Sequence, residues 1–206
     1  MTPRSRARVW YCGMPRSGST WQFNVGWALS PSTVRGKFHV FPPGSEPILE
    51  TMMRDDISLA YIHRDVRYAL RSLVDTGLVD QLGGLEWYSR EVVDHHHKII
   101  DLAHMDEVLV QRYGELMRNP QKQALELALW LGVAVPLQKV VEIAHEWSLG
   151  SLEKNVEEHG DEWREKHALI PNHISKHRGD RESWEEGLTR GQRKTIERAW
   201  EKINAE

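Results

Sequence analysis

Apolar and polar positions along the chain form two kinds of segment that alternate. Short apolar runs, typical of buried parallel strands, occur at 9–12, 37–41, 59–63 and from 107 onward. Segments with helical spacing or helix-terminating residues are predicted at 19–29, 46–54, 66–75, 85–105, 121–131, 136–145 and 189–204. Strands that alternate with helices imply a parallel sheet with right-handed crossovers. The pattern therefore predicts a single α/β domain over residues 1–206, a three-layer sandwich with a central parallel sheet.

The strongest local signal lies between Arg8 and Leu29. An apolar run is followed by a turn that holds Gly13, Pro15 and Gly18, and then by a segment rich in large apolar residues. A strand, a glycine turn and a helix form an arrangement that binds phosphate, because the first N–H groups of the helix point at the anion and the helix dipole favours it. The stretch predicts a P-loop-like phosphate-binding loop, and an ordinary strand-to-helix turn is the alternative.

The loop differs from the ATP and GTP loops in the position of its cation. Those loops place lysine directly after their second glycine. Here Ser19 has that position, and the cation, Arg16, precedes Gly18 by two residues. The apolar run at 59–62 ends in His63-Arg64-Asp65, which is not a convincing second carboxylate strand for Mg²⁺. These features favour transfer of a group that needs less charge neutralisation than a γ-phosphate, and a sulfuryl group fits.

Two further stretches support this interpretation. The first runs from Tyr61 to Ser72 and places an arginine, Arg64, at a strand end and a serine eight residues later. The second runs from Val108 to Pro120, with Tyr113 at the end of a strand. Together with the loop Pro15-Arg-Ser-Gly-Ser-Thr-Trp21, they resemble the motifs of the sulfotransferases that use 3′-phosphoadenosine-5′-phosphosulfate (PAPS). The resemblance extends from Trp10 to about Ile203.

The resemblance implies a set of residues that bind PAPS. The 5′-phosphosulfate would be held by Arg16, Ser17, Gly18, Ser19 and Thr20, the 3′-phosphate by Arg64 and Ser72, and the adenine by Trp21, Tyr113, Ser148 and Leu149. Trp21 could instead be a core aromatic residue. Arg178-Gly179 lies where the family has an Arg-Lys-Gly triplet, but the first arginine of that triplet is His177 in this chain.

The resemblance also implies three catalytic residues. Arg16 would stabilise the leaving oxygen electrostatically, since arginine stays protonated. Lys37-Phe38-His39 matches a lysine-x-histidine pair on the acceptor side of the family, and strand alternation places both side chains on one face. Lys37 would contact the sulfuryl oxygens and His39 would remove the acceptor proton. A half-buried strand histidine is the alternative for His39, and Glu46 or Glu50 is then the fallback base.

Composition narrows the partners. A net charge of −3 gives no reason to expect binding to nucleic acid or to an anionic membrane. The single cysteine, Cys12, fits a reducing compartment, and with no signal-like or transmembrane-length run we expect a cytoplasmic protein. We expect no metal: His95, His96 and His97 are consecutive on a predicted helix, point in different directions and would form a solvated face.

The chain is thus interpreted as a sulfotransferase that uses PAPS and acts on a hydroxyl or amine of a small-molecule or carbohydrate-like acceptor. The alternatives are a small-molecule kinase with a degenerate loop and a nucleotide-binding module without catalysis. Residues 147–188 are polar and weakly patterned, and we expect an irregular segment that closes over nucleotide and acceptor. Glu185, Thr189, Arg190 and Lys194 depart from the family's usual dimer motif, so no dimer through this segment is expected.

Overall fold

A parallel sheet forms the centre of the protein. The computed structural model describes residues 6–14, 16–38, 56–81, 83–166 and 183–205. Within these residues four strands form a sheet in the order β2-β1-β3-β4, and every pairing is parallel. The strands are β1 (Arg8–Gly13), β2 (Val34–Phe38), β3 (Ser58–His63) and β4 (Val108–Arg112). The predicted α/β class and the parallel sheet are confirmed.

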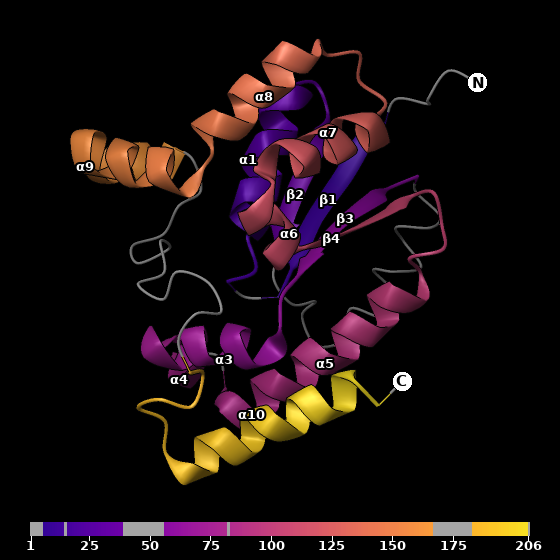
Figure 1. Cartoon of the computed structure of the whole chain (residues 1–206). Coiled ribbons are helices and arrows are strands. Elements are labelled where there is room, and N and C mark those ends of the chain that lie inside the picture. Colours follow the sequence, from indigo (N-terminus) through magenta and orange to yellow (C-terminus); the bar gives the residue numbers. More distant parts are fainter. Residues whose placement is uncertain (1–5, 15, 39–55, 82, 167–182, 206) are drawn as a thin grey trace.

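Helices cover both faces of the sheet (Figure 1). One face carries α1 (Ser19–Leu29), α6 (Tyr113–Arg118), α7 (Pro120–Leu131) and α8 (Leu137–Glu146). The other face carries α3 (Val66–Asp75), α4 (Leu78–Gln81), α5 (Leu85–Asp101) and α10 (Arg190–Ile203). The helix α9 (Leu149–Lys166) follows α8. The result is a sandwich of helices, sheet and helices.

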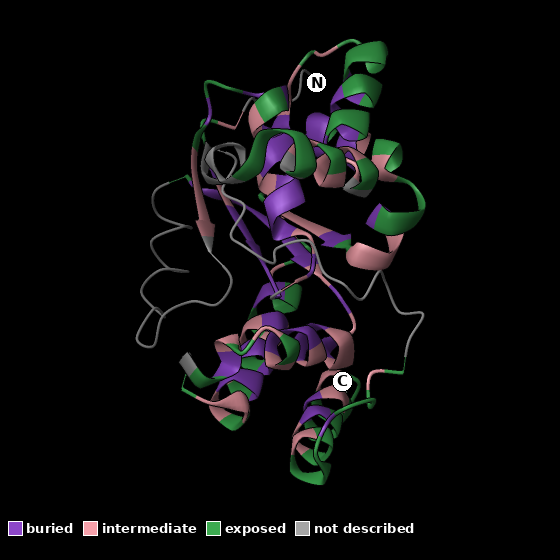
Figure 2. Cartoon of the chain, turned by 90° about the vertical axis from the view of Figure 1, so that its left-hand side faces the viewer, coloured by how far each residue is buried: buried purple, intermediate pink, exposed green. Residues whose placement is uncertain are grey.

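The strand β3 shows why the sheet is central. Its residues are buried from Ser58 to Ile62, as a strand covered on both faces requires. Leu59 and Tyr61 pack toward α3 and α5, whereas Ala60 and Ile62 pack toward α1 and α7. Figure 2 shows the buried residues gathered on the sheet and on the inner sides of the helices. Each face of the sheet thus has its own apolar core.

The helix ends follow the signals in the sequence. Asp65 caps α3 by accepting a hydrogen bond from the Arg67 backbone N–H at 2.9 Å. Asn119 caps α7 in the same way, and Gly132 ends it in the left-handed conformation with φ 69°. Thr189 caps α10 in a reciprocal capping box with Gln192. Local sequence alone accounts for these boundaries.

Several expectations about secondary structure differ from the structure. The helix predicted over 85–105 ends at Asp101, and the short helices α4 and α6 were not predicted. The strand predicted from Lys37 begins earlier, at Val34, because parallel pairing with β1 starts at Arg8. The segment 147–188, expected to be irregular, contains the helix α9, which is interrupted at Gly160, whose φ is 66°. The predicted helix at 46–54 lies outside the described residues. Among the helices that are described, none has the length and apolar character needed to span a membrane.

The packing of α1 on the sheet depends on one glycine. A Cβ atom on Gly26 would lie 2.0 Å from the Tyr11 hydroxyl oxygen and 2.5 Å from its Cζ. Tyr11 belongs to β1 and is 1% exposed, so it has little room to move. The absence of a side chain at Gly26 therefore lets α1 lie close to the strand that precedes the phosphate-binding loop.

We expect Gly26→Ala to lower the free energy of unfolding by about 1–3 kcal/mol, the usual cost of overpacking a core. Urea denaturation followed by circular dichroism measures the change. The matched control is Gly114→Ala in α6, where nothing lies within 4 Å of an added Cβ. That variant should be neutral or more stable by up to about 1 kcal/mol, because alanine favours helix more than glycine does. Equal stability of the two variants would contradict the close approach of α1 to Tyr11.

Candidate active site

The site lies at the edge of the sheet where the strands end. Gly13 at the end of β1 is paired with Ile62, and His63 at the end of β3 is paired with Arg112 of β4. Because the strands are parallel, the segments that follow them leave the sheet at the same edge, where open α/β sheets bind ligands. The loop after β1, Arg64 after β3 and Tyr113 after β4 are thereby brought together.

Ser17 holds the loop to the sheet. Its hydroxyl lies 2.6 Å from the Met14 carbonyl oxygen and 2.8 Å from that of Ile62, and it is fully buried. The Met14 backbone N–H also donates to the Ile62 carbonyl, at 3.2 Å. The single hydroxyl hydrogen of Ser17 is therefore directed at these two carbonyl oxygens, one in the loop and one at the end of β3. These bonds give the side chain a role in shaping the loop. Its predicted contact with a phosphosulfate stays a prediction.

Gly18 is the turning point between the loop and α1. Its φ is 92°, a left-handed conformation that favours glycine, and a Cβ would lie 2.8 Å from Leu116 Cδ2. The first hydrogen bond within the helix joins the Gln22 N–H to the Gly18 carbonyl at 3.0 Å. The start of α1, with the buried residues Ser19 and Thr20, thus presents a helix N-terminus at the site edge.

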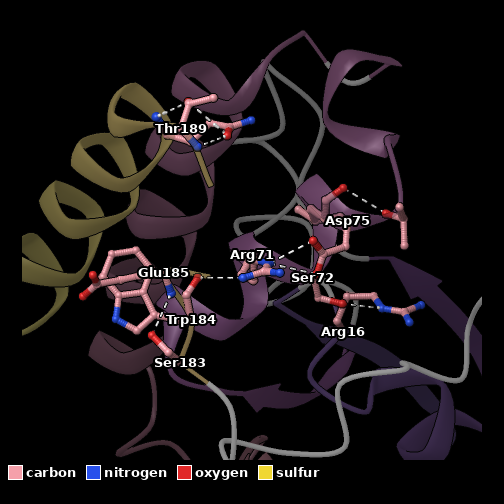
Figure 3. A network of polar contacts seen from close by, with 11 residues as sticks. Arg16, Arg71, Ser72, Asp75, Ser183, Trp184, Glu185 and Thr189 are labelled. Carbon is pink, nitrogen blue, oxygen red and sulfur yellow. Dashed lines mark hydrogen bonds and ion pairs between the residues drawn. The ribbon is translucent and has the colours of Figure 1, made fainter. Parts of the chain in front are cut away.

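Arg16, Arg64 and Ser72 form one hydrogen-bonded group. Arg16 Nε donates to Ser72 Oγ at 3.1 Å, and Arg64 donates from one terminal nitrogen to the Arg16 carbonyl at 3.4 Å. Figure 3 shows the Arg16 side chain extended toward Ser72 on α3. The pKa of the Arg16 guanidinium is lowered, and burial is the main cause. Tyr113 offsets part of this shift, and Arg64 lowers the pKa further. The structure therefore brings together three residues that the sequence predicted for the two phosphate groups.

Aromatic rings hold Arg64 in place. Its guanidinium lies 4.7 Å from the ring centre of Tyr113 and 5.5 Å from that of Tyr68. Arg64 is 5% exposed, and such contacts offset part of the cost of burying its charge. Tyr68 was not among the residues predicted from the sequence. Its position four residues before Ser72, on the same side of a helix, was the signal that could have indicated it.

The segment that leads into α10 is fixed to the same helix. Arg71 donates from Nε to both Asp75 carboxylate oxygens, at 2.8 and 2.9 Å, and from a terminal nitrogen to the Trp184 carbonyl at 3.2 Å. These contacts are drawn in Figure 3 beside the bond between Arg16 and Ser72. Neighbouring residues of α3 thus contact the loop after β1 and the segment before α10.

Lys37 of β2 contacts the start of α1. Its ammonium donates a hydrogen bond to Thr20 Oγ1. Lys37 is paired with Tyr11 across the sheet, so it lies on the face that α1 covers. Burial lowers the pKa of Lys37 to about 8. An anion at the start of α1 would favour the charged form of this group.

The residues predicted to contact adenine are less well gathered. Trp21 belongs to the core beside Val25 and is 7% exposed, and its stacking on adenine stays a prediction. Ser148 bonds to Ser151 Oγ at 3.0 Å and precedes α9. Tyr113, another candidate for adenine, contacts the Arg64 guanidinium.

Several predicted residues cannot be compared with the structure. His39, Glu46, Glu50, Arg178 and Gly179 lie outside the described residues, and for Leu149 the backbone alone is described, at the start of α9. Their roles stay predictions.

A buried chain of glutamines behind the loop was not anticipated. Gln22 Nε2 donates to Gln111 Oε1 at 2.9 Å, and Gln111 Nε2 donates to the Gln123 carbonyl at 2.9 Å. All three residues are at most 3% exposed. They tie the first turns of α1 and α7 to β4. The signal in the sequence was that Gln22, a polar residue, stands among large apolar residues in the segment 19–29.

The solvated face predicted for His95 to His97 is wrong for His96. That residue is 8% exposed, and its Nδ1 lies 3.0 Å from the Tyr61 hydroxyl. The His63 ring is 5.0 Å away, and burial lowers the pKa of both histidines to about 4. The reason is the tertiary structure. Tyr61 and His63 of β3 point toward α5, and His96 lies on the side of α5 that faces them.

Comparison with known proteins identifies the family. Residues 79–204 match the family model described as the sulfotransferase domain. No curated protein sequence gives a significant match. Among solved structures, mouse sulfotransferase SULT7A1 complexed with PAP is similar with a TM-score of 0.71 and 14% identity, over 98% of this chain and 85% of that one. Retinol dehydratase in complex with androsterone and the inactive cofactor PAP gives 0.69 and 12%, over 100% and 82%.

The chain belongs to the sulfotransferase family. The family model covers more than half of the sequence, and the structural likeness shows the same fold independently. The family named from the three sequence motifs is therefore confirmed. The protein is an enzyme of sulfuryl transfer, and the kinase and the non-catalytic module are not favoured.

We expect Lys37 to titrate near pH 8 in the free protein, because burial lowers its pKa. With lysine labelled at Cε, ¹³C NMR should show one resonance with this midpoint, and the resonance should be missing from Lys37→Met. An unfolded lysine keeps its proton to about pH 10.4, so between the two pKa values the unfolded chain binds more protons. The free energy of unfolding should accordingly rise from pH 8 to pH 10 in the native chain and not in the variant. A midpoint above pH 10 would contradict the burial of this ammonium.

Proposed function

We propose that this sulfotransferase takes its sulfuryl group from PAPS and transfers it to a hydroxyl or amine of a small-molecule or carbohydrate-like acceptor. The observation that carries the proposal is the group formed by Arg16, Arg64 and Ser72 at the carboxyl edge of the sheet, with the start of α1 and Lys37 beside it. The solved neighbours with bound PAP support the same donor.

Two subsites follow from the positions of the cations. Arg64 and Ser72, from the end of β3 and from α3, suit a phosphate on the ribose, since charged hydrogen bonds to phosphate are strong and directional. The loop, the start of α1 and Lys37 suit the phosphosulfate, because helix N–H groups and an ammonium converge there. The donor would thus be held by arginine at one end and by the helix start and lysine at the other.

The chemistry needs charge stabilisation and one proton acceptor. During transfer the bond between sulfur and the phosphate oxygen breaks, a bond between sulfur and the acceptor atom forms, and the acceptor proton passes to a base. Arg16 would stabilise the negative charge that develops on the leaving phosphate, and Lys37 the oxygens of the group in transit. His39 is the proposed base, with Glu46 or Glu50 as the fallback.

The proposal includes a class of acceptor and a cellular compartment. The similar solved structures of retinol dehydratase contain retinol or androsterone, which supports a small molecule as the acceptor. Cys12 is buried and free, which suits the reducing conditions of the cytoplasm. Incubation of the chain with ³⁵S-labelled PAPS and a library of phenols, alcohols, amines and sugars tests the proposal directly. Transfer of label to no acceptor, with the donor bound, would contradict it.

We further propose that residues 185–194 do not form the family's dimer. Thr189 caps α10 through Gln192, and Glu185 lies 4.0 Å from Arg193, so polar groups of this segment are engaged within the chain. Another interface remains compatible with these contacts.

We expect adenosine 3′,5′-bisphosphate to bind at least tenfold more tightly than ADP, without Mg²⁺. A 3′-phosphate gains charged hydrogen bonds worth about 1.5–3 kcal/mol at Arg64 and Ser72, and ADP lacks that group. Isothermal titration calorimetry in the presence of EDTA measures both affinities. Equal affinity, or a requirement for Mg²⁺, would contradict PAPS as the donor.

We expect His39→Ala to reduce turnover by roughly 10²–10⁴-fold, the usual loss when a general base is removed. Its affinity for adenosine 3′,5′-bisphosphate should stay within a factor of about three, because the histidine is proposed to face the acceptor. Single-turnover kinetics on an acceptor found in the library measures the rate, and calorimetry the affinity. Near-native turnover would transfer the role to Glu46 or Glu50, and lost nucleotide binding would indicate a structural histidine.

A further inference from the structure

A second cation lies on the strand that carries Lys37. Arg35 and Lys37 are two residues apart on β2, so their side chains are on the same face of the sheet. That face is the one α1 covers, because their partners on β1, Val9 and Tyr11, belong to the core beneath this helix. Figure 1 shows α1 beside β1 and β2. A ligand that extends from Lys37 along β2 therefore meets Arg35.

Two aromatic rings of α1 contact the Arg35 guanidinium. Its central carbon lies 4.2 Å from the ring centre of Trp27 and 5.4 Å from that of Phe23. Phe23 and Trp27 are four residues apart, so both lie on one side of the helix. A cation–π contact of this kind orients the positive charge but satisfies none of the N–H donors with an oxygen acceptor. The rings thus position Arg35 and leave its hydrogen-bonding capacity for a ligand.

The charge of Arg35 is not compensated within the described part of the chain. Its guanidinium forms no hydrogen bond and no ion pair with any described residue, and the side chain is partly exposed. Burial lowers the pKa of Arg35, and Tyr11 offsets part of this shift. Burial also raises the pKa of Tyr11, so this hydroxyl is uncharged at neutral pH. An arginine keeps its proton under such conditions, and an anion from outside the described residues would be attracted to it.

The spacing of the two cations sets the length of the ligand. Lys37 reaches Thr20 at the start of α1, whereas Arg35 reaches Trp27, seven residues further along the helix. Strand residues two apart are separated by about 6.5 Å, and helix residues seven apart by about 10 Å. The charged ends of the two side chains are therefore about 7–10 Å apart. An acceptor with an anionic group at that distance from its reacting hydroxyl can contact both.

We propose that Arg35 is a specificity-determining residue that binds a carboxylate or sulfate group on the acceptor, so that this sulfotransferase acts on elongated anionic acceptors. This rests on the proposed function, because it takes Lys37 as the cation beside the transferred group. Two oxygens of such an anion match the planar pair of donors that a guanidinium presents. Arg35 then selects charged over neutral acceptors and takes no part in binding the nucleotide.

The test compares acceptors that differ in this one charge. One pair is 3-(4-hydroxyphenyl)propionate and its uncharged amide, and the other is methyl cellobioside and its uronate, in which the terminal primary alcohol is a carboxylate. With ³⁵S-labelled PAPS, the native chain should prefer the charged member of at least one pair by about tenfold or more in kcat/KM. Arg35→Met should lower this preference at least about fivefold and leave kcat/KM for the neutral member within about twofold.

Arg198→Met is the matched control. Arg198 is an exposed arginine on α10, which covers the opposite face of the sheet, so this variant removes the same charge away from β2. It should keep the native preference for the charged acceptor. Both variants should bind adenosine 3′,5′-bisphosphate with native affinity, within about twofold, by calorimetry. A loss of preference as large in Arg198→Met as in Arg35→Met would attribute the effect to net charge and overturn the subsite.

NMR gives a second measurement that does not depend on turnover. In the full chain with ¹⁵N-labelled arginine and bound adenosine 3′,5′-bisphosphate, the Nε resonance of Arg35 is the one that Arg35→Met lacks. The charged member of the preferred pair should shift this resonance in a saturable way, and its neutral partner should not. An unshifted resonance at saturating charged acceptor would overturn the inference.

The outcomes separate this inference from the proposed function. Transfer to no acceptor at all, with the donor bound, would refute the proposed function and the inference with it. Activity on other acceptors of the library but not on the charged probes would overturn the inference alone. Equal native rates within both pairs, or a preference that Arg35→Met keeps, would do the same. Equal losses on both members of a pair in Arg35→Met would assign Arg35 a structural role instead.

Discussion

The arrangement of the site depends on one buried hydroxyl. Ser17 reaches the carbonyl oxygens of Met14 and Ile62, and thereby joins the loop after β1 to the end of β3. Arg16 precedes this residue and Gly18 follows it, so the direction of the cation and the start of α1 are both set from the same point. Because Ser17 is fully buried, this bond is shielded from competing water.

Three positively charged side chains gather around this residue, and contacts with neighbouring side chains restrict each of them. Arg64 contacts the rings of Tyr68 and Tyr113, Arg16 donates to Ser72, and Lys37 donates to Thr20. Helix α3 contributes Tyr68 and Ser72 to the two arginines, and α1 contributes Thr20 to Lys37. Charges that are already oriented need little reorganisation when negative charge develops in a transferring group, which is how electrostatic catalysis lowers a barrier.

The polar contacts behind the site explain how this orientation is maintained. Gln22, Gln111 and Gln123 link α1, β4 and α7 inside an otherwise apolar core. Arg71 links α3 to the segment before α10. Buried polar chains of this kind stabilise one arrangement over others, since a shifted helix would leave donors without acceptors. The glutamine chain thereby fixes α1, which carries Thr20, relative to β4, which leads into Tyr113, and Arg71 fixes the helix that carries Ser72 to the segment before α10.

The sequence by itself determined the α/β class, most helix boundaries and the family. These features depend on local signals: apolar periodicity, capping residues such as Asp65 and Thr189, and short motifs that include Arg16, Arg64 and Ser72. Only the tertiary structure decided how the side chains are used. The bond between Arg16 and Ser72, the burial of His96 and the packing of Trp21 involve residues far apart in the chain or on other elements. Spacing within one segment cannot reveal such contacts, because they are created when the strand ends and helices are brought together.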